Sequence, residues 1–402
     1  MLRNITPNRV EIVASIIRWV MLAARTLSLP ELVAAVGQHI PRHLDLEQTA
    51  RDCITLCNPL IVIHGEKITL LHQSAKDYFF RHNEDKDPVL EKFSIKAGDG
   101  HLILAETCIR GLDGRSALAA YARSHWPEHA RQCADNEKLL ITRNEPFFAK
   151  SSRLRERWWR QYIMLDMGNN SELRSSRKIP RLHMACYLGL KQWADIILVS
   201  MWRLSRPWRI NQSWSLKTPL CVAIVAGHAS LVEYLLAQGA DPNSGMLWNE
   251  NRPLEYAARF ECSHDIITTM LSYGANVDVL LYASIRFCNE VQTMDLALKH
   301  GADINRTCGV YPLDGMNPIG LAIMMWERAR FYHISEMAPR ENARRLLQAG
   351  VNPLARDYKG NTAIQYAKHD ILEDVRSLFK EFGYNYMRTR SHGLREEELP
   401  LL

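Results

Sequence analysis

Three side chains within residues 72–77 are of the types that hydrolases use as a catalytic triad. His72, Ser74 and Asp77 supply a base, a nucleophile and a carboxylate. They span the end of a predicted strand and the start of a predicted helix, where Ser and Asp side chains cap free backbone amides. We therefore interpret Ser74 and Asp77 as helix-capping residues, and proton relay is the alternative.

A metal site is the second chemistry that these residues suggest. Cys53 and Cys57 lie four residues apart on a predicted helix, with His64 and His72 further along the chain. Structural zinc sites use closely spaced Cys pairs joined to a second pair of ligands at fixed spacing, and that pattern is absent here. The two thiols share a helix face with Leu56, so we predict that they pack in the core and that no metal is bound.

Neither of two common catalytic motifs occurs in the sequence. There is no G-x-x-x-x-G-K-[ST] run, whose amides and Lys hold nucleotide phosphates. There is also no G-x-S-x-G turn, which presents the nucleophile of α/β-hydrolases. We predict no catalytic residue and no cofactor, and we expect that the protein is not an enzyme.

The composition is that of an ordinary globular protein of 402 residues, with 47% hydrophobic and 23% charged residues. Nine scattered cysteines favour reduced thiols and therefore the cytoplasm, with the nucleus as the alternative. The longest apolar stretch, "VEIVASIIRWVMLAA", is interrupted by Glu11 and Arg18 and predicts an amphipathic helix, not a membrane span. The net charge of +6 permits an anionic partner without requiring one.

The stretch "TPLCVAIVAGHASLVEYLLAQGADPN", residues 218–243, predicts two short helices joined by a turn. Thr218 and Pro219 are typical of a helix start, because Thr caps an amide and Pro needs none. Gly227 ends the first helix and Gly239 the second. Neither helix is long enough to be stable alone, so such a unit must stack on similar neighbours.

Similar units recur through the second half of the chain. An Ala recurs near the middle of each predicted first helix, at Ala185, Ala223, Ala257, Ala283, Ala322 and Ala367. Second helices end in "GADPN", "GANVD", "GADIN", "GVNPL" and "GYN". These units resemble the ankyrin repeat, a helix-turn-helix unit of about 33 residues with a T-P-L-H-x-A pattern. The resemblance implies about six irregular ankyrin repeats over residues 177–387, the fourth of them short and the fifth carrying an insertion at 326–342.

The first ninety residues predict three helices followed by a β-hairpin. Pro7 opens the first helix, Ser28 and Glu31 form a capping box before the second, and Asp45 caps the third. The alternating stretch "LIVIHGEKITLLH" turns at Gly65 and predicts the hairpin. This order is that of a winged helix, which we assign to residues 1–86.

The stretches "IIRWVMLAARTLSLPELVAAV", "CITLCNPLIVI" and "ITLLHQSAKDYFF" resemble the winged-helix segment of fungal NACHT-ankyrin proteins. These are NLR/STAND-like proteins, and the segment is also known from relatives of GPI inositol-deacylase. The stretches "HLILAETCIRGL" and "YARSHWPEHA" are similar to the helical connector of that family, which implies a connector at 87–176. The resemblance ends near residue 387, and we assign residues 388–402 to a polar tail. Because the nucleotide-binding NACHT P-loop domain is absent, we expect the C-terminal portion of such a protein, a truncated product or an incomplete gene model. The NACHT domain would then be supplied by another chain or by missing upstream sequence.

The predicted fold is therefore mainly α, with a winged-helix domain and a helical connector leading into an ankyrin-repeat solenoid. Such solenoids bind macromolecules along a concave face, so we expect a protein-protein interaction scaffold or sensor module with a protein partner. Hairpin tips, short inner helices and the insertion would supply the contacts. The candidate partner-binding residues are Trp248, Asn249, Arg252, Arg259, Tyr311, Asp314, Trp326, Arg330 and Tyr332.

The alternative is a nucleic-acid-associated regulator that uses the winged helix and an Arg/Trp-rich connector. The third helix, "LEQTARDCITLC", exposes Glu47, Gln48, Arg51 and Asp52, and such a face is not basic. The connector stretch "SSRLRERWWRQY" could stack bases on its two Trp, or it could bury them against the first repeat. We favour the second reading and expect neither a nucleic-acid nor a membrane partner.

Overall fold

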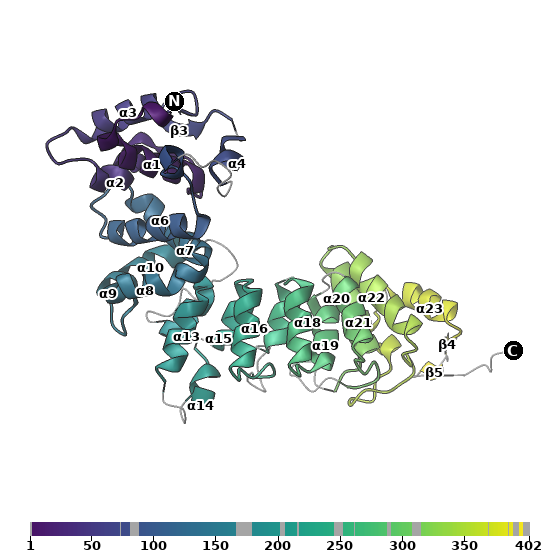
Figure 1. Cartoon of the computed structure of the whole chain (residues 1–402). Helices are drawn as coiled ribbons and strands as arrows, with labels where there is room; N and C mark the ends of the chain where they lie inside the picture. Colours follow the sequence, from purple (N-terminus) through teal and green to yellow (C-terminus); the bar gives the residue numbers. More distant parts are fainter. Residues whose placement is uncertain are drawn as a thin grey trace. The chain divides into compact units, whose positions relative to one another are not determined.

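The computed structural model describes residues 2–72, 74–80, 88–165, 179–201, 206–214, 217–244, 252–260, 262–287, 291–307, 315–368, 370–384, 386–388 and 394–396. Contacts between residues divide the chain into two compact units, Met1–Val199 and Ser200–Leu402. Both units are mainly helical (Figure 1).

The first unit begins with three helices and a small antiparallel sheet, at the places that the sequence predicts. The elements are α1 (Pro7–Leu22), β1 (Leu27–Ser28), α2 (Leu29–Val36), α3 (Leu46–Leu56), β2 (Ile61–His64) and β3 (Lys67–Leu70). Strand β3 lies between the other two, and Ile68 is opposite both Leu27 and Ile63. Ser28 and Glu31 form the predicted capping box of α2, and the Asp45 carboxylate accepts a hydrogen bond from the Gln48 amide at the start of α3.

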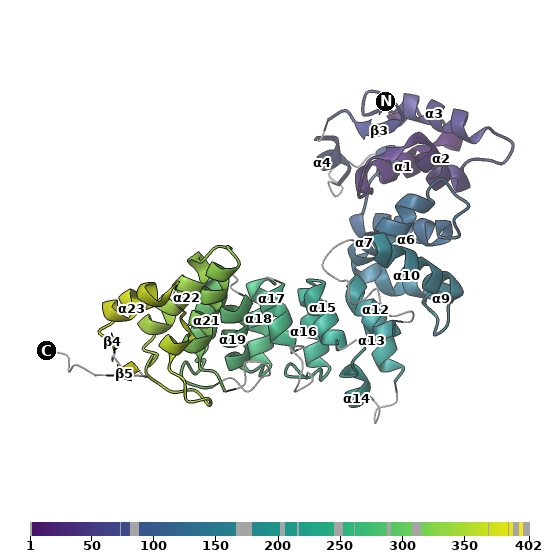
Figure 2. The ribbon, with the colours of Figure 1, turned by 180° about the vertical axis from the view of Figure 1, so that it is seen from behind.

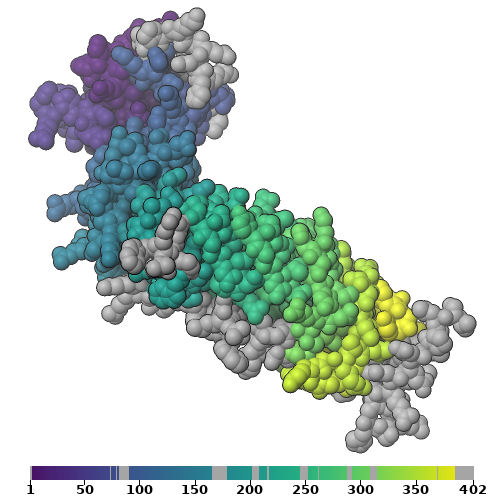
Figure 3. Space-filling model, turned by 60° about the horizontal axis from the view of Figure 1, so that its bottom comes forward, coloured from purple at the N-terminus to yellow at the C-terminus, as the bar shows by residue number. Residues whose placement is uncertain are grey.

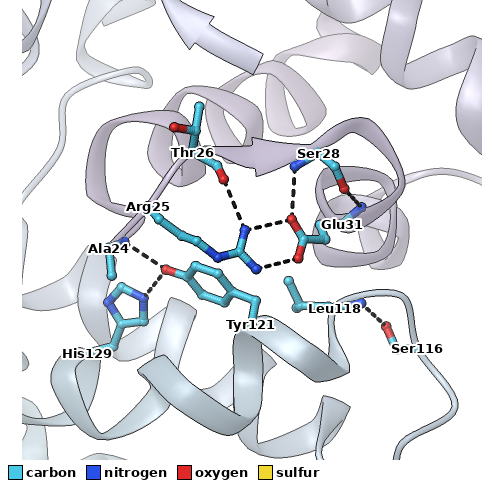
Figure 4. Close-up of polar contacts among 9 residues, drawn as sticks. All are labelled: Ala24, Arg25, Thr26, Ser28, Glu31, Ser116, Leu118, Tyr121 and His129. Atoms are coloured by element: carbon cyan, nitrogen blue, oxygen red, sulfur yellow. Dashed lines mark hydrogen bonds and ion pairs between the residues drawn. The ribbon is translucent and has the colours of Figure 1, made fainter. Parts of the chain in front are cut away.

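Further helices complete the first unit. They are α4 (Ser74–Phe80), α5 (Pro88–Glu91), α6 (Ala97–Gly111), α7 (Ala119–Gln132), α8 (Glu137–Arg143), α9 (Glu145–Phe148), α10 (Arg153–Leu165), α12 (Arg181–Leu188) and α13 (Lys191–Val199). Helices α6 and α7 pack on each other, and α6 also contacts α1. Figure 4 shows how Tyr121 joins α7 to the segment that follows α1. The Tyr121 hydroxyl accepts a hydrogen bond from the Ala24 amide at 2.9 Å, and the Arg25 guanidinium stacks on the Tyr121 ring.

An aromatic cluster holds the second half of this unit together. Trp126 of α7 contacts the rings of Phe147, Phe148 and Trp158, with centroid distances of 4.9 to 6.0 Å. The Trp159 ring contacts Tyr187 of α12 edge-on at 5.4 Å. These contacts fix helix α10 against the first helix pair of the repeat type, α12 and α13.

The second unit consists of helix pairs, which Figure 2 shows from behind. Its helices are α14 (Arg206–Ile210), α15 (Pro219–Val225), α16 (Ala229–Ala237), α17 (Pro253–Arg259), α18 (His264–Ser272), α19 (Val277–Phe287), α20 (Val291–Lys299), α21 (Pro318–Phe331), α22 (Met337–Gln348), the short 3-10 helix η4 (Ala363–Tyr366) and α23 (Leu372–Glu381). The first helices form one row, because α15, α17, α19, α21 and η4 contact one another in that order. Figure 3 shows these repeats as a continuous band in chain order.

The recurring alanines explain how closely the first helices approach. Ala223, Ala257, Ala283 and Ala322 lie on neighbouring helices of this row and are at most 3% exposed. A larger side chain at these positions would hold the helices apart. Ala185 is also buried, in α12 of the first unit. The prediction fails at Ala367, which follows the 3-10 helix η4 and is only partly buried.

Side chains bridge the turns that link successive repeats. The side-chain Oδ1 of Asn211 accepts from the Asp241 backbone amide, and Oδ1 of Asn243 accepts from the Asn276 backbone amide, both at 2.8 Å. The preceding glycines, Gly239 and Gly274, have φ angles of 92° and 83°, which a residue with a Cβ rarely adopts. The sequence "G-A-x-x-N/D" therefore combines a left-handed helix end with a link between repeats.

The predicted domain limits near residues 86, 176 and 387 remain predictions. The division into compact units falls between residues 199 and 200, so the pair α12 and α13 belongs to the first unit. In the region of the predicted polar tail, strands β4 (Tyr386–Arg388) and β5 (Leu394–Glu396) form an antiparallel pair.

Candidate protein-binding surface

Two candidate residues lie at opposite ends of the inner helix α17. Arg252 precedes the helix, is partly buried, and its backbone amide donates to the Glu255 carboxylate at 3.1 Å. Arg259 ends the helix and is exposed. Its guanidinium carbon lies 5.7 Å from the ring centre of Phe260 and 5.8 Å from that of Phe287 on α19. Arg259 is therefore available to a partner, whereas Arg252 acts mainly through its backbone.

The insertion predicted at 326–342, between the two helices of the fifth unit, comprises the end of α21, a turn at 332–336 and the start of α22. Helix α21 has 14 residues, compared with 7 in both α15 and α17. Figures 1 and 2 show the turn between α21 and α22 rising above the ends of neighbouring helices. Both helices of this pair therefore continue beyond the length of an ordinary repeat.

Trp326 was predicted to contact a partner, and this prediction is wrong because the side chain is 1% exposed. It lies four residues after the buried Ala322 and three before the buried Ala329, on the core face of α21. Its Nε1 donates to the Glu336 carboxylate at 2.8 Å. The helical spacing of Ala322, Trp326 and Ala329 is the sequence signal that indicates this burial.

Arg330 is occupied by contacts within the repeat. It donates to the Glu336 carboxylate at 2.7 Å, to the Asp374 carboxylate at 2.8 Å and to the Asp370 carbonyl at 2.8 Å. The hydrogen bond from Arg330, and to a lesser extent that from Trp326, lowers the pKa of Glu336. Arg330 therefore fixes the extended hairpin on the next repeat and is not a free contact for a partner.

The turn that these contacts hold in place carries large apolar side chains in solvent. Tyr332, a predicted contact residue, is 62% exposed. Three residues that sequence reasoning missed accompany it: Phe331 (69% exposed), Ile334 (63%) and Met337 (82%). We call Phe331, Tyr332, Ile334 and Met337 the tip cluster. Grouped exposed apolar side chains on a fixed support are typical of binding surfaces.

Four candidate residues cannot be placed. Trp248, Asn249, Tyr311 and Asp314 lie outside the described residues. Of the predicted contact residues within them, the structure leaves Arg259 and Tyr332 exposed to a partner.

The side chains that could bind nucleic acid are either paired within their own helix or buried. On α3, Arg51 pairs with Glu47 at 2.8 Å and Gln48 donates to Asp52 at 2.9 Å. In the connector, Trp158 and Trp159 are at most 3% exposed and cannot stack on bases. The reading that these two Trp bury against neighbouring helices, Tyr187 of the first helix pair included, fits their contacts.

The side chains considered above for a catalytic triad and for a zinc site are not arranged as those sites require. His72 Nδ1 and Ser74 Oγ lie 2.7 Å apart at the exposed start of α4, but within the described residues Asp77 has no hydrogen bond to either. Cys53 and Cys57 are buried, and burial raises the pKa of the Cys57 thiol to about 12, which disfavours the thiolate that zinc requires. The described part of the chain contains no group of three or more side chains placed to hold a metal ion.

Among the described helices, none is both long and apolar enough to cross a membrane. The seven described cysteines are free thiols, six of them buried.

Comparison with known proteins agrees with the repeat geometry. Residues 182–280 match the family model of ankyrin repeats, in its three-copy form. No curated protein matches the sequence. The chain thus carries ankyrin repeats, and its class is that of mainly helical proteins with an ankyrin-repeat solenoid.

Solved structures of ankyrin proteins are also similar to about half of this chain. An ankyrin repeat domain from Acinetobacter baumannii AYE is 22% identical, covers 50% of this chain and 97% of its own, and has a TM-score of 0.39. The ankyrin repeat protein EF0377 is 18% identical, with coverages of 50% and 96% and a TM-score of 0.37. The human ASB11 ankyrin repeat domain is 18% identical, with coverages of 50% and 97% and a TM-score of 0.32.

Proposed function

We propose that this protein is an interaction module that binds a protein partner through the row of first ankyrin helices (α15, α17, α19, α21 and η4), here called the inner row, and through the tip cluster. The main support is the tip cluster itself, four large apolar side chains held in solvent by the Arg330 contacts. Aromatic, Met and Arg side chains are enriched in the centres of protein interfaces, and preorganisation reduces the entropy lost on binding. The candidate chemistry is recognition and not catalysis.

The partner can be sought with the full chain. Tagged protein would be cross-linked in cells that express it, and each retained protein would be purified and titrated against the tagged chain by calorimetry. We expect a double substitution, Phe331→Ser with Tyr332→Ser, to weaken binding at least about tenfold, because central aromatic contacts contribute about 2 kcal/mol or more.

The matched control is Tyr273→Ser. Tyr273 is 43% exposed and follows helix α18, in the other helix row of the repeats. Equal affinities of the wild type and both variants would refute the assignment of the surface. Failure of every purified candidate to bind the wild type would refute the proposed function.

We propose further that the module is the sensing part of a NACHT-ankyrin type signalling protein. The helix-strand-helix-helix-strand-strand order of the first unit, with β3 central in the sheet, supports a winged helix of that type. A NACHT domain in another chain or in a longer form of this protein would be its partner for signalling. Co-expression with a NACHT domain from the same genome, followed by size-exclusion chromatography, tests this; two separate peaks at micromolar concentrations would count against it.

A further inference from the structure

The arrangement around Arg259 suggests which chemical group a partner presents to the inner row. The Arg259 guanidinium lies near the rings of Phe260 and Phe287, which belong to successive repeats. A guanidinium stacked on ring faces keeps its N–H donors at the edges, where they can reach a ligand. The rings thus restrict the arginine without using its hydrogen bonds.

No acidic side chain neutralises Arg259 within the described residues. Glu255 is four residues earlier on α17, a separation that often allows an ion pair. Its side chain is only 8% exposed and accepts from the Arg252 amide at the other end of the helix. This hydrogen bond holds the Glu255 carboxylate at the start of α17, whereas Arg259 lies at its end.

Neighbouring side chains continue the same alternation of cations and rings. Arg286 lies over the Phe287 ring at 5.4 Å, and Tyr256 stacks on Phe260 at 6.1 Å. Lys217 lies over the Tyr256 ring at 5.2 Å. Lys217 and Tyr256 are only 2% exposed and lie beneath the surface. The solvent-facing part of this arrangement consists of the exposed Arg259 and the partly exposed Phe260, Arg286 and Phe287. This surface is therefore cationic and aromatic, and it spans two successive repeats.

We propose that Arg259 binds a carboxylate side chain of an acidic segment of the protein partner. This inference rests on the proposed function and specifies the partner's chemistry. A carboxylate matches the fork of guanidinium donors with two parallel hydrogen bonds, and a preorganised arginine loses little rotamer freedom when it forms them. The Arg259 guanidinium covers faces of Phe260 and Phe287, which leaves less room for bases to stack, and this favours a carboxylate over a nucleic acid.

The test uses the full chain and fluorescence anisotropy. The probes are a fluorescein-labelled peptide of alternating Glu and Leu, the same peptide with Gln in place of Glu, and a labelled single-stranded DNA. We expect the Glu peptide to bind at least about tenfold more tightly than the Gln peptide, because hydrogen bonds between charged groups contribute about 1.5–3 kcal/mol. Arg259→Ala should remove that difference, and Arg259→Lys should lose most of it because lysine lacks the fork.

Lys299→Ala is the control, since it removes one exposed positive charge at the end of α20 in the other helix row. The Lys299→Ala variant should retain nearly all of the preference for the Glu peptide over the Gln peptide. Circular dichroism would verify that every variant is folded. Equal binding of the Glu and Gln peptides, or equal losses in the Arg259→Ala and Lys299→Ala variants, would overturn the proposal. Tighter binding of the DNA than of the Glu peptide, lost in Arg259→Ala, would overturn it in favour of a nucleic acid.

Failure of this inference can be separated from failure of the proposed function. If a purified partner binds the wild type and loses affinity on substitution of Phe331 and Tyr332, but not on substitution of Arg259, the interaction function stands. The acidic contact is then refuted alone.

Discussion

Glu137 is a carboxylate that the first unit buries at the start of α13, where its Oε1 accepts from the Trp193 amide at 3.1 Å. Burial raises its pKa to about 7 from the ordinary value of 4.5, although the hydrogen bonds from Gln192 and Trp193 oppose this. Because the folded pKa is higher than the unfolded one, the folded state loses stability as pH rises from about 4.5 through 7. We expect Glu137→Gln to be more stable than the wild type above pH 7, by up to about 3 kcal/mol.

Thermal unfolding of both proteins between pH 4.5 and 8 would measure this effect. Glutamine keeps an acceptor for the Trp193 amide, so the comparison isolates the charge. If the difference in melting temperature between wild type and variant is the same at every pH from 4.5 to 8, the role of Glu137 is contradicted.

His129 affects the pH dependence of stability in the opposite direction to Glu137. It is 1% exposed, its Nδ1 lies 3.0 Å from Nδ1 of His101, and its Nε2 lies 2.8 Å from the Tyr121 hydroxyl (Figure 4). Burial, and then the nearby His101 and His125, lower its pKa from 6.5 to about 3. Its contribution to stability is therefore complete above pH 6.5 and is lost as pH falls, by about 2 kcal/mol at pH 5.

We expect His129→Gln to reduce the loss of melting temperature of the first unit between pH 7 and pH 5. His101 also has a lowered pKa, caused by burial, so part of the acid sensitivity should remain. Charged groups facing this cluster include Glu128, which raises the pKa of His101, Arg25, which stacks on Tyr121, and Glu31, which raises the pKa of His125. If the variant loses as much stability in acid as the wild type, the His cluster is not the sensitive group.

At the scale of elements, the extended hairpin α21 and α22 depends on Glu336. This carboxylate accepts from Trp326 and Arg330, so its removal leaves the buried Trp326 Nε1 without its acceptor. We expect Glu336→Ala to lower the free energy of unfolding of the second unit by about 1–3 kcal/mol. Chemical denaturation followed by tryptophan fluorescence would report it, with Glu373→Ala on α23 as a control, because the Glu373 side chain is 81% exposed and its ion pair contributes little. A loss no larger than that of the control would contradict this role.

Helix starts and turns were predictable because the residues that form them are local in sequence. Thr218 caps α15 by accepting from the Cys221 amide, as its neighbour Pro219 suggests. The extension of α21 does not follow from the usual repeat length, whereas helical spacing places Trp326 on the same face of the helix as Ala322. The first helix of the sixth unit is a short 3-10 helix, at whose start Thr362 and Gln365 form a capping box.

At the scale of the whole molecule, the helical class and the ankyrin repeats follow from repetition along the sequence. The division between residues 199 and 200 does not, because it depends on contacts between distant segments. The sequence of α13 predicts a helix of the repeats. In the structure α13 packs on α8, and its Trp193 amide donates a hydrogen bond to Glu137, which lies 56 residues earlier in the chain. Likewise, exposure of the tip cluster depends on how far α21 extends, which no single motif determines.

Two compact units imply that a core defect should remain in the unit that contains it. Leu235 on α16 and Leu104 on α6 are both fully buried, and truncation of either to alanine should cost about 2–5 kcal/mol. Repeats are stabilised mainly by their neighbours, so Leu235→Ala should accelerate amide hydrogen exchange in α15, α16, α17 and α18 together. Helices α6 and α7 should remain protected, whereas Leu104→Ala should produce the reverse pattern. Hydrogen exchange measured by mass spectrometry on the full chain distinguishes these outcomes, and faster exchange across both units in either variant would show that the chain unfolds as a single cooperative body.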